Sequence, residues 1–143
     1  MENIIAIDPG GKTGIFYRND KEEQFIEINK SWKETYGEIK ELVQELKIQQ
    51  VIFEDTNYIN NRSKESLNLF RLLGALECLE VQQVKSVNVL RVKELYKRLF
   101  SSKETIPYLT YSQGRGHGWK YKGNRISIHC LDALLIYHLY KNS

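Results

Sequence analysis

Short apolar runs separated by turn-forming residues open the chain. Residues 3–8, 13–18 and 23–28 carry these runs, and the segments 8–11 (Asp-Pro-Gly-Gly) and 18–21 (Arg-Asn-Asp-Lys) separate them. Turns of this composition join neighbouring strands. The pattern therefore predicts three antiparallel strands at the start of the chain.

Helical periodicity then alternates with short apolar runs. Ser31, with Glu34 three residues later, fits a capping box at the start of a helix. The remaining predicted elements are a strand at 50–54, a helix at 62–79, a strand at 84–88, and helices at 89–100 and 126–140. Residues 102–124 show no clear periodicity, and we expect irregular structure there.

This order of elements predicts an α/β fold. Right-handed crossovers place the strands at 50–54 and 84–88 parallel to the first strand. We therefore expect a five-stranded mixed sheet, with strand order 3-2-1-4-5 and helices on both faces. The 143 residues contain no repeat, low-complexity tract or linker, which predicts a single domain over 1–143.

Acidic residues end two of the predicted strands. Asp8 closes the first strand and Glu54 closes the fourth, and these strands are neighbours in the expected order. Their carboxylates would then lie side by side at the carboxyl edge, where open α/β sheets place their sites. Asp55 follows directly, and strand alternation lets only one of Glu54 and Asp55 face Asp8. The pattern alone does not choose between them, and Asp8 also suits a plain turn.

The last helix carries an acid within an apolar pattern. Asp132 is costly there unless it pairs or binds a metal. His129 lies three residues earlier and so shares a helix face with it. An imidazole either ligates a divalent metal or orients the attacking water. Asp8, Glu54, His129 and Asp132 together predict a divalent-metal site.

Positive charge is concentrated in one part of the chain. Residues 85–125 hold ten Lys and Arg against two acids, a net charge of +8, whereas the rest of the chain carries −5. This asymmetry predicts a polyanion-binding surface, with a solvated lysine-rich face as the alternative. Lys93, Lys97 and Arg98 are spaced to form a stripe on the helix at 89–100, and Lys103 follows it.

A glycine-rich stretch spans residues 114–123. It lacks the Gly-Lys-Ser/Thr of a P-loop and the context of a dinucleotide fingerprint. Its basic and aromatic residues suit a mobile loop over phosphates and unstacked bases, with a disordered surface loop as the alternative. The residues that we expect to contact DNA there are Arg115, Trp119, Lys120 and Lys122.

The remaining features predict a cytoplasmic protein. The first residues lead directly into a strand without a signal peptide, and no apolar stretch approaches the length that spans a membrane. Cys78 and Cys130 lack metal-ligand spacing and lie in helical patterns, so we expect reduced cysteines in the core.

Four segments together resemble the RuvC-type Holliday-junction resolvases. Residues 5–14 (Ile-Ala-Ile-Asp-Pro-Gly-Gly-Lys-Thr-Gly) are similar to the opening motif of that family, and residues 51–54 (Val-Ile-Phe-Glu) to the second. Val92-Lys93 resembles the Val-Lys segment, and residues 129–134 (His-Cys-Leu-Asp-Ala-Leu) resemble the closing motif. The motifs recur in order across essentially the whole chain, which looks like the compact phage-type members.

The resemblance implies an RNase H-like fold and a homodimer that makes two symmetric cuts in a four-way DNA junction. Asp8, Glu54 and Asp132 match the catalytic carboxylates, and His129 stands where many members carry an Asp. The aromatic that often follows the catalytic Glu by three residues is replaced by Asn57. Tyr58 is then the candidate for the residue that probes the junction core.

Phosphodiester cleavage suits this set of residues. Two Mg²⁺ ions roughly 3.5–4 Å apart activate water and stabilise the leaving oxygen, and carboxylates are their preferred ligands. We expect two Mg²⁺ ions per site, with Mn²⁺ as a substitute. The alternatives are an RNase H-like nuclease acting on RNA, flaps or other branched intermediates, and a non-catalytic junction-binding module.

Overall fold

The main sheet has the predicted strands and the predicted order. The computed structural model describes residues 2–55, 64–112 and 118–142. β1 (Ile4–Asp8), β2 (Thr13–Arg18) and β3 (Glu23–Ile28) form an antiparallel meander. β4 (Gln50–Asp55) pairs parallel to β1, and β5 (Gln83–Asn88) pairs parallel to β4. The order β3-β2-β1-β4-β5 is therefore confirmed.

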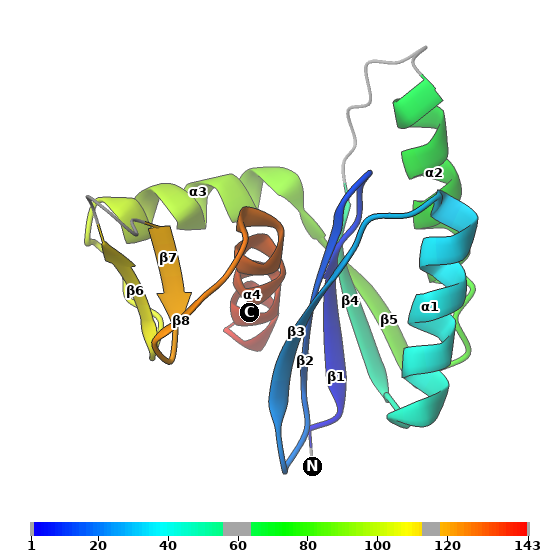
Figure 1. Ribbon diagram of the computed structural model, residues 1–143, viewed down its shortest axis with the longest axis horizontal. Helices are drawn as coiled ribbons and strands as arrows, with labels where there is room; N and C mark the ends of the chain where they lie inside the picture. Colours follow the sequence, from blue (N-terminus) through cyan, green and yellow to red (C-terminus); the bar gives the residue numbers. More distant parts are fainter. Residues whose placement is uncertain (1, 56–63, 113–117, 143) are drawn as a thin grey trace.

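The predicted helices cover both faces of this sheet. They are α1 (Trp32–Glu45), α2 (Lys64–Glu77), α3 (Val89–Phe100) and α4 (Ile128–Lys141). α1 begins at the predicted capping box: the Ser31 hydroxyl accepts a hydrogen bond from the Glu34 N–H at 3.2 Å and donates to the Glu34 carboxylate at 2.9 Å. Figure 1 shows α1 and α2 on one side of the sheet and α3 and α4 on the other.

Strand alternation divides the apolar side chains between two cores. Ile5 and Ile7 of β1 pack with α1 and α2, whereas Ile4 and Ala6 pack with α3 and α4. All four side chains are fully buried, because helices cover both faces of the central strands. Each strand residue thus packs against one of the two helical layers. The same alternation determines toward which layer each strand-end acid points.

A second, smaller sheet occupies the segment for which we expected irregular structure, so that expectation is wrong. It consists of β6 (Leu109–Ser112), β7 (Gly118–Tyr121) and β8 (Asn124–Arg125), in the order β6-β7-β8. A tight turn joins β7 to β8 through Lys122 at φ 52° and Gly123 at φ 82°. Positive φ at both central residues is the conformation that two-residue hairpin loops favour. Strands of two to four residues are too short for their alternation to stand out from the sequence.

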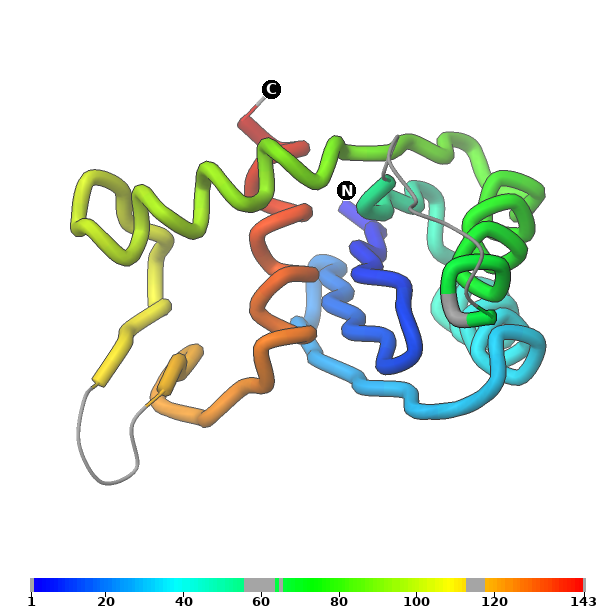
Figure 2. The backbone as a smooth tube through the Cα atoms, turned by 90° about the horizontal axis from the view of Figure 1, so that it is seen from above, coloured from blue at the N-terminus to red at the C-terminus, as the bar shows by residue number. Residues whose placement is uncertain are grey.

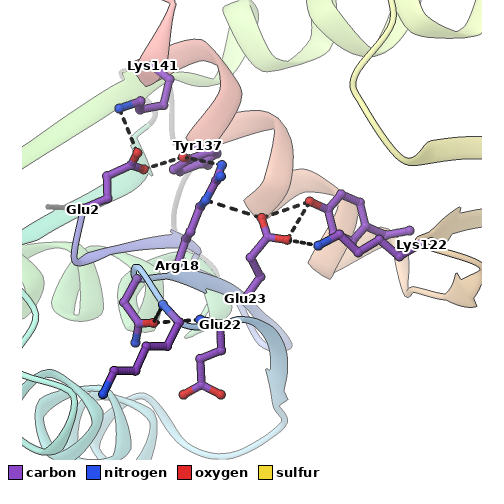
Figure 3. A network of polar contacts seen from close by, with 10 residues as sticks. Glu2, Arg18, Glu22, Glu23, Lys122, Tyr137 and Lys141 are labelled. Carbon is purple, nitrogen blue, oxygen red and sulfur yellow. Dashed lines mark hydrogen bonds and ion pairs between the residues drawn. The ribbon is translucent and has the colours of Figure 1, made fainter.

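A polar network holds the small sheet against the main sheet (Figure 3). The carboxylate of Glu23, at the start of β3, accepts hydrogen bonds from the Tyr121 hydroxyl at 3.0 and 3.1 Å and pairs with Lys122. Arg18 lies 3.6 Å from the same carboxylate and donates to the Tyr137 hydroxyl at 3.2 Å. Contacts between residues about a hundred positions apart thus fix where the small sheet lies.

Seen from above, α4 runs between the two sheets, and α3 leads from the main sheet to the small one (Figure 2). The buried residues of α3 and α4 share one core with Trp119 of β7. No helix in the described part of the chain combines the length and the apolar character that crossing a membrane requires. Cys130 is buried as expected, but Cys78 is exposed because it lies just beyond the end of α2.

Candidate functional site

Asp8 and Glu54 lie next to each other at the carboxyl edge of the main sheet. Ile7 of β1 is paired with Phe53 of the parallel strand β4, so the next residue of each strand is an acid. Ala6 and Ile52, two residues before these acids, both belong to the core beneath α4. Because side chains two apart share a strand face, both carboxylates turn toward α4.

The same register turns Asp55 away from this site. Val51 and Phe53 belong to the opposite core, with α1 and α2, and Asp55 continues their alternation. The strand pattern had left Glu54 and Asp55 as alternatives, and the motif resemblance had favoured Glu54. The packing of β4 places Glu54, and not Asp55, beside Asp8.

The start of α4 reaches this edge because Gly14 of β2 has no side chain. A Cβ atom on Gly14 would lie 2.0 Å from the carbonyl oxygen of His129, a separation that no real contact permits. Ser127 caps the helix by accepting a hydrogen bond from the Cys130 N–H at 3.1 Å. Gly14 was not among the predicted site residues, although a glycine inside an apolar strand is a signal of close backbone approach.

α4 brings His129 and Asp132 to the two strand-end acids. The Nδ1 atom of His129 lies 3.7 Å from the Oδ2 atom of Asp8, with the imidazole about one-third exposed and Asp8 nearly buried. Asp132, one turn further, interacts electrostatically with both Asp8 and Glu54. The structure therefore places all four residues that the sequence predicted for a metal site at one edge of the main sheet, with His129 and Asp8 as the pair in contact.

Burial raises the pKa values of all three carboxyl groups, and repulsion between the acids adds to the rise at Asp8 and Glu54. The pKa of Asp8 is raised to about 8, first by burial and then by the negative charges of Glu54 and Asp132. Burial followed by Asp132 raises the pKa of Glu54 to about 7, and Lys93 offsets part of this rise. Burial raises the pKa of Asp132 to about 6, against the opposing effect of His129. Negative charge is thus crowded here and only partly compensated, a pattern that favours a bound cation.

Two of the three carboxylates, Glu54 and Asp132, border an open hollow of about 330 Å³ between β4, α3 and α4. Lys93 and Lys97 of α3 line it as well. Tyr96, between these lysines in sequence, also lines it, although the sequence analysis did not select it. A hollow lined by both carboxylates and lysines suits a ligand that binds cations and carries its own negative charge, such as a phosphodiester.

The predicted basic stripe is only partly formed. Lys93 and Lys97 lie on one face of α3, one turn apart, as expected. Arg98 instead turns to Glu104, 2.7 Å away, in the loop after the helix. Lys103 is exposed just beyond α3, and Lys120 is half-buried on β7. Lys122 pairs with Glu23, and its ammonium group lies 5.0 Å from the Tyr108 ring centre. Its charge therefore contributes to the contact between the two sheets.

We had expected Trp119 to lie on a mobile loop over DNA, and this expectation is wrong. It belongs to β7 and is only 9% exposed, with its ring centre 5.0 Å from Tyr111 and 5.9 Å from Tyr96. A buried ring is not available for stacking on a base, so Trp119 has a packing role. Tyr58 and Arg115 lie outside the described residues, and their contacts with DNA stay predictions.

The side chains at this edge are of types that can bind a divalent metal. Three carboxylates at the edge of the main sheet supply the oxygen ligands that Mg²⁺ prefers, and His129 is a fourth potential donor. Within residues 2–55, 64–112 and 118–142, no group of three or more His, Cys, Asp or Glu side chains is arranged so that it could hold a metal ion. The acids would have to draw closer together to share one ion.

Comparisons with solved structures identify the fold. RuvC of T. thermophilus in complex with a Holliday junction substrate superposes with a TM-score of 0.60 at 16% sequence identity, over 99% of this chain and 96% of that one. A second Thermus thermophilus RuvC structure gives a TM-score of 0.51 at 16% identity, over 97% and 95%. The yeast mitochondrial Holliday junction resolvase Ydc2 gives 0.52 at 12% identity, over 94% and 75%.

The chain therefore has the RNase H-like fold of the RuvC-type resolvases, as its motifs predicted. No family model matches the sequence, and no curated protein matches it in a sequence search. At identities of 12–16% the likeness establishes the fold. The chemistry of the site has to be argued from the residues themselves.

Proposed function

We propose that this protein is a metal-dependent endonuclease that cleaves phosphodiester bonds at four-way DNA junctions. The observation that carries the proposal is the convergence of Asp8, Glu54 and Asp132, with His129, at the carboxyl edge of the main sheet. The RuvC-type fold supports it, because two solved structures with that fold are Holliday-junction proteins.

Asp8, Glu54 and Asp132 would hold two Mg²⁺ ions, which when bound activate water and stabilise the leaving oxygen. Asp8 is central, because it neighbours Glu54 in the sheet and His129 on α4. His129 either completes the ligand set or orients the water through its ring nitrogen. A bound cation would lower the pKa values that burial raises at these three acids, so the carboxyl groups would be ionised in the loaded site.

Lys93 and Lys97 would hold the DNA strand against the carboxylates. Both lysines line the same hollow as Glu54 and Asp132, so a phosphate there would contact the lysines and any metal ions that the carboxylates hold. Lys93 also partly offsets the electrostatic cost of Glu54 before DNA arrives. We assign to these two lysines the positioning of the scissile phosphate and of its neighbour along α3.

Two symmetric cuts require two such sites, so we propose a homodimer. Leu67 and Phe70 of α2 are 47% and 51% exposed, and they lie three residues apart on one helix face. An exposed apolar pair of this kind supports a contact with a second copy. The mass of the protein in solution, measured by sedimentation, tests this part of the proposal directly.

The decisive experiment compares four substrates: a synthetic four-way junction, a linear duplex, a flap and an RNA–DNA hybrid. Each is incubated with Mg²⁺, Mn²⁺ or EDTA. The expected result is cleavage of the junction with Mg²⁺ or Mn²⁺, in paired symmetric positions, and none with EDTA. The preferred substrate separates junction resolution from activity on flaps or hybrids.

The same cleavage assay, applied to variants, tests the roles of individual residues of the site. Glu54→Gln should abolish cleavage, whereas the matched variant Asp55→Asn, on the other face of β4, should retain most of it. His129→Ala should slow cleavage strongly, and His129→Asp should recover part of the rate, because a carboxylate also binds the metal. Junction binding with no cleavage in any metal would instead identify a non-catalytic binding module.

A further inference from the structure

Four aromatic rings gather where the end of α3 meets the small sheet. Phe100 and Tyr111 form the outer pair, with ring centres 5.4 Å apart and exposures of 55% and 40%. Tyr96 and Trp119 lie beneath them, with Tyr96 stacked on Phe100 at 6.2 Å and Trp119 against Tyr111 at 5.0 Å. The two exposed rings are therefore held by two less exposed ones, which fixes their position before any ligand binds.

These rings border a hollow of about 420 Å³ between the end of α3 and strands β6 and β7. Its size is within the range of small-ligand sites, about 300–1,000 Å³. Phe100, Tyr111 and Trp119 line it together with Glu104, whose carboxylate is compensated by Arg98 at 2.7 Å and by His138 at 3.4 Å. The hollow thus presents aromatic surface with little uncompensated negative charge.

The aromatic cluster and the hollow beside the carboxylates lie along the same face of α3. Lys93, Tyr96, Lys97 and Phe100 are spaced i, i+3, i+4 and i+7, so they share one face of α3. The first three line the hollow at Glu54 and Asp132, and Phe100 lines the next one. Figure 2 shows α3 running from the main sheet to the small sheet, so this face connects the two hollows.

We propose that this face of α3 is a track for the cleaved strand, on which unpaired nucleotides at the crossover stack on Phe100 and Tyr111. The inference rests on the proposed nuclease function and adds a base-binding site to it. Ammonium groups alternating with ring faces match a strand in which phosphates alternate with bases. A duplex would keep its bases stacked inside the helix and leave both rings without a partner.

The geometry also locates the stacked nucleotides. Seven residues separate Lys93 from Phe100, or about 10 Å along the helix. That length covers at most about three nucleotide steps, since 3.4 Å is the step of a stacked strand and an unstacked strand is more extended. The nucleotides on the rings should therefore lie within about four positions of the cleaved bond.

A thermodynamic cycle tests the proposal. Binding to a four-way junction is measured in EDTA, so that no cleavage occurs, with the bases within four positions of the cut removed one at a time. Wild-type protein should lose about 5- to 150-fold in affinity at one or two of these positions. The double variant Phe100→Leu, Tyr111→Leu keeps apolar packing but has no ring faces, so the same base removals should change its affinity less than about twofold.

Tyr108→Ala is the matched control, because Tyr108, directly before β6, is 66% exposed but does not line either hollow along α3. It should retain the full penalty for base removal. An unchanged penalty in the Leu double variant overturns the stacking site, as does a wild-type protein that cleaves junctions with no penalty at any position. A change of oligomeric mass in the Leu variant, without coupling to the bases, would assign the rings to a protein interface. A wild-type protein that neither binds nor cleaves branched DNA would overturn the nuclease function as well.

Discussion

Two acidic clusters lie at opposite ends of α4, and they differ in how their charge is compensated. At the start of α4, Asp8 is buried beside Glu54 and Asp132, and its pKa is raised to about 8. Near the end of α4, burial alone would also raise the pKa of Glu2. Hydrogen bonds from Tyr137 and Lys141 bring it below its usual value instead.

Glu23 belongs to the compensated cluster. Its carboxylate contacts Arg18, Tyr121 and Lys122, so each oxygen has a partner within the protein (Figure 3). Such an arrangement stabilises a fold and leaves no opening for a cation. The crowded carboxylates at the other end are costly to the fold, and natural proteins accept this kind of cost at functional sites.

The largest expected difference between the two clusters is in the cleavage rate of variants that lack one of their acids. Asp8→Asn, Glu54→Gln or Asp132→Asn should each lower the single-turnover cleavage rate at least about 10³-fold, because metal-dependent charge stabilisation contributes several kcal/mol. Junction affinity in EDTA should change little, since basic side chains and not acids contact phosphates. Glu23→Gln should leave the rate nearly intact. Full activity in any of the three site variants would remove that residue from the site.

The next effect concerns the approach of α4 to the sheet. Gly14→Ala should lower the unfolding free energy by about 2–4 kcal/mol, because the new methyl group would overlap the His129 carbonyl. Cleavage should fall as well, since a displaced α4 moves His129 away from Asp8. Gly37→Ala is the control, because nothing lies within 4 Å of a Cβ at this exposed position of α1. It should raise stability by about 0.5–1 kcal/mol, and denaturant titration measures both variants.

The raised pKa of Asp8 predicts a pH-dependent cost to stability. Between its usual value of 3.8 and its folded value of about 8, the folded protein keeps a proton that the unfolded chain releases. Stability from this group therefore falls as the pH rises through that window. In EDTA, the gain in unfolding free energy from Asp8→Asn should grow by about 2–3 kcal/mol between pH 5.5 and pH 8. A gain that does not vary with pH would contradict this account.

Glu23→Gln should lower the unfolding free energy, whereas Asp8→Asn should raise it. The amide keeps the shape of the side chain but loses the charge that Arg18 and Lys122 contact, and it accepts a weaker hydrogen bond from Tyr121. The lysine and the arginine are about half exposed, so we expect a loss of only about 1–2 kcal/mol in unfolding free energy. Thermal unfolding at pH 7 measures it, and a stabilised Glu23→Gln variant would erase the distinction between the two clusters.

The main sheet and the carboxylate site could be predicted because their signals are local and strong. An acid directly after Val51-Ile52-Phe53 contrasts sharply with its surroundings, and so does Asp132 in an apolar helix. The choice between Glu54 and Asp55 could not be made from alternation alone. It depends on which helical layer covers each face of β4, and that is a property of the assembled fold.

The small sheet and the partners of the basic residues could not be predicted, because they depend on distant contacts. β7 has four residues in which Gly118 and Lys120 alternate with aromatic residues, a pattern that also suits a loop. Trp119 becomes a core residue only because α3 and α4 pack over it. Arg98 leaves the basic stripe because the chain turns after α3 and brings Glu104 to it.

The smallest expected effect is a change in the salt dependence of DNA binding. It distinguishes basic residues that contact DNA from those that are paired within the protein. Lys93 and Lys97 line the hollow beside the carboxylates, and Arg98 is occupied by Glu104. Each lysine that contacts a phosphate releases about one counterion on binding, so Lys93→Ala with Lys97→Ala should lower the slope of log affinity against log salt by about two. Arg98→Ala should leave that slope unchanged, because a paired guanidinium releases no counterion from DNA.

Fluorescence anisotropy with a labelled junction in EDTA, titrated at several salt concentrations, measures these slopes. The double lysine variant should weaken binding to duplex and junction alike, since phosphate contacts carry no information about DNA shape. Equal slopes for the wild type and the double lysine variant would move the DNA-binding face away from α3. A reduced slope for Arg98→Ala alone would show that Arg98 leaves Glu104 when DNA binds, so that the basic stripe predicted from the sequence forms only in the complex.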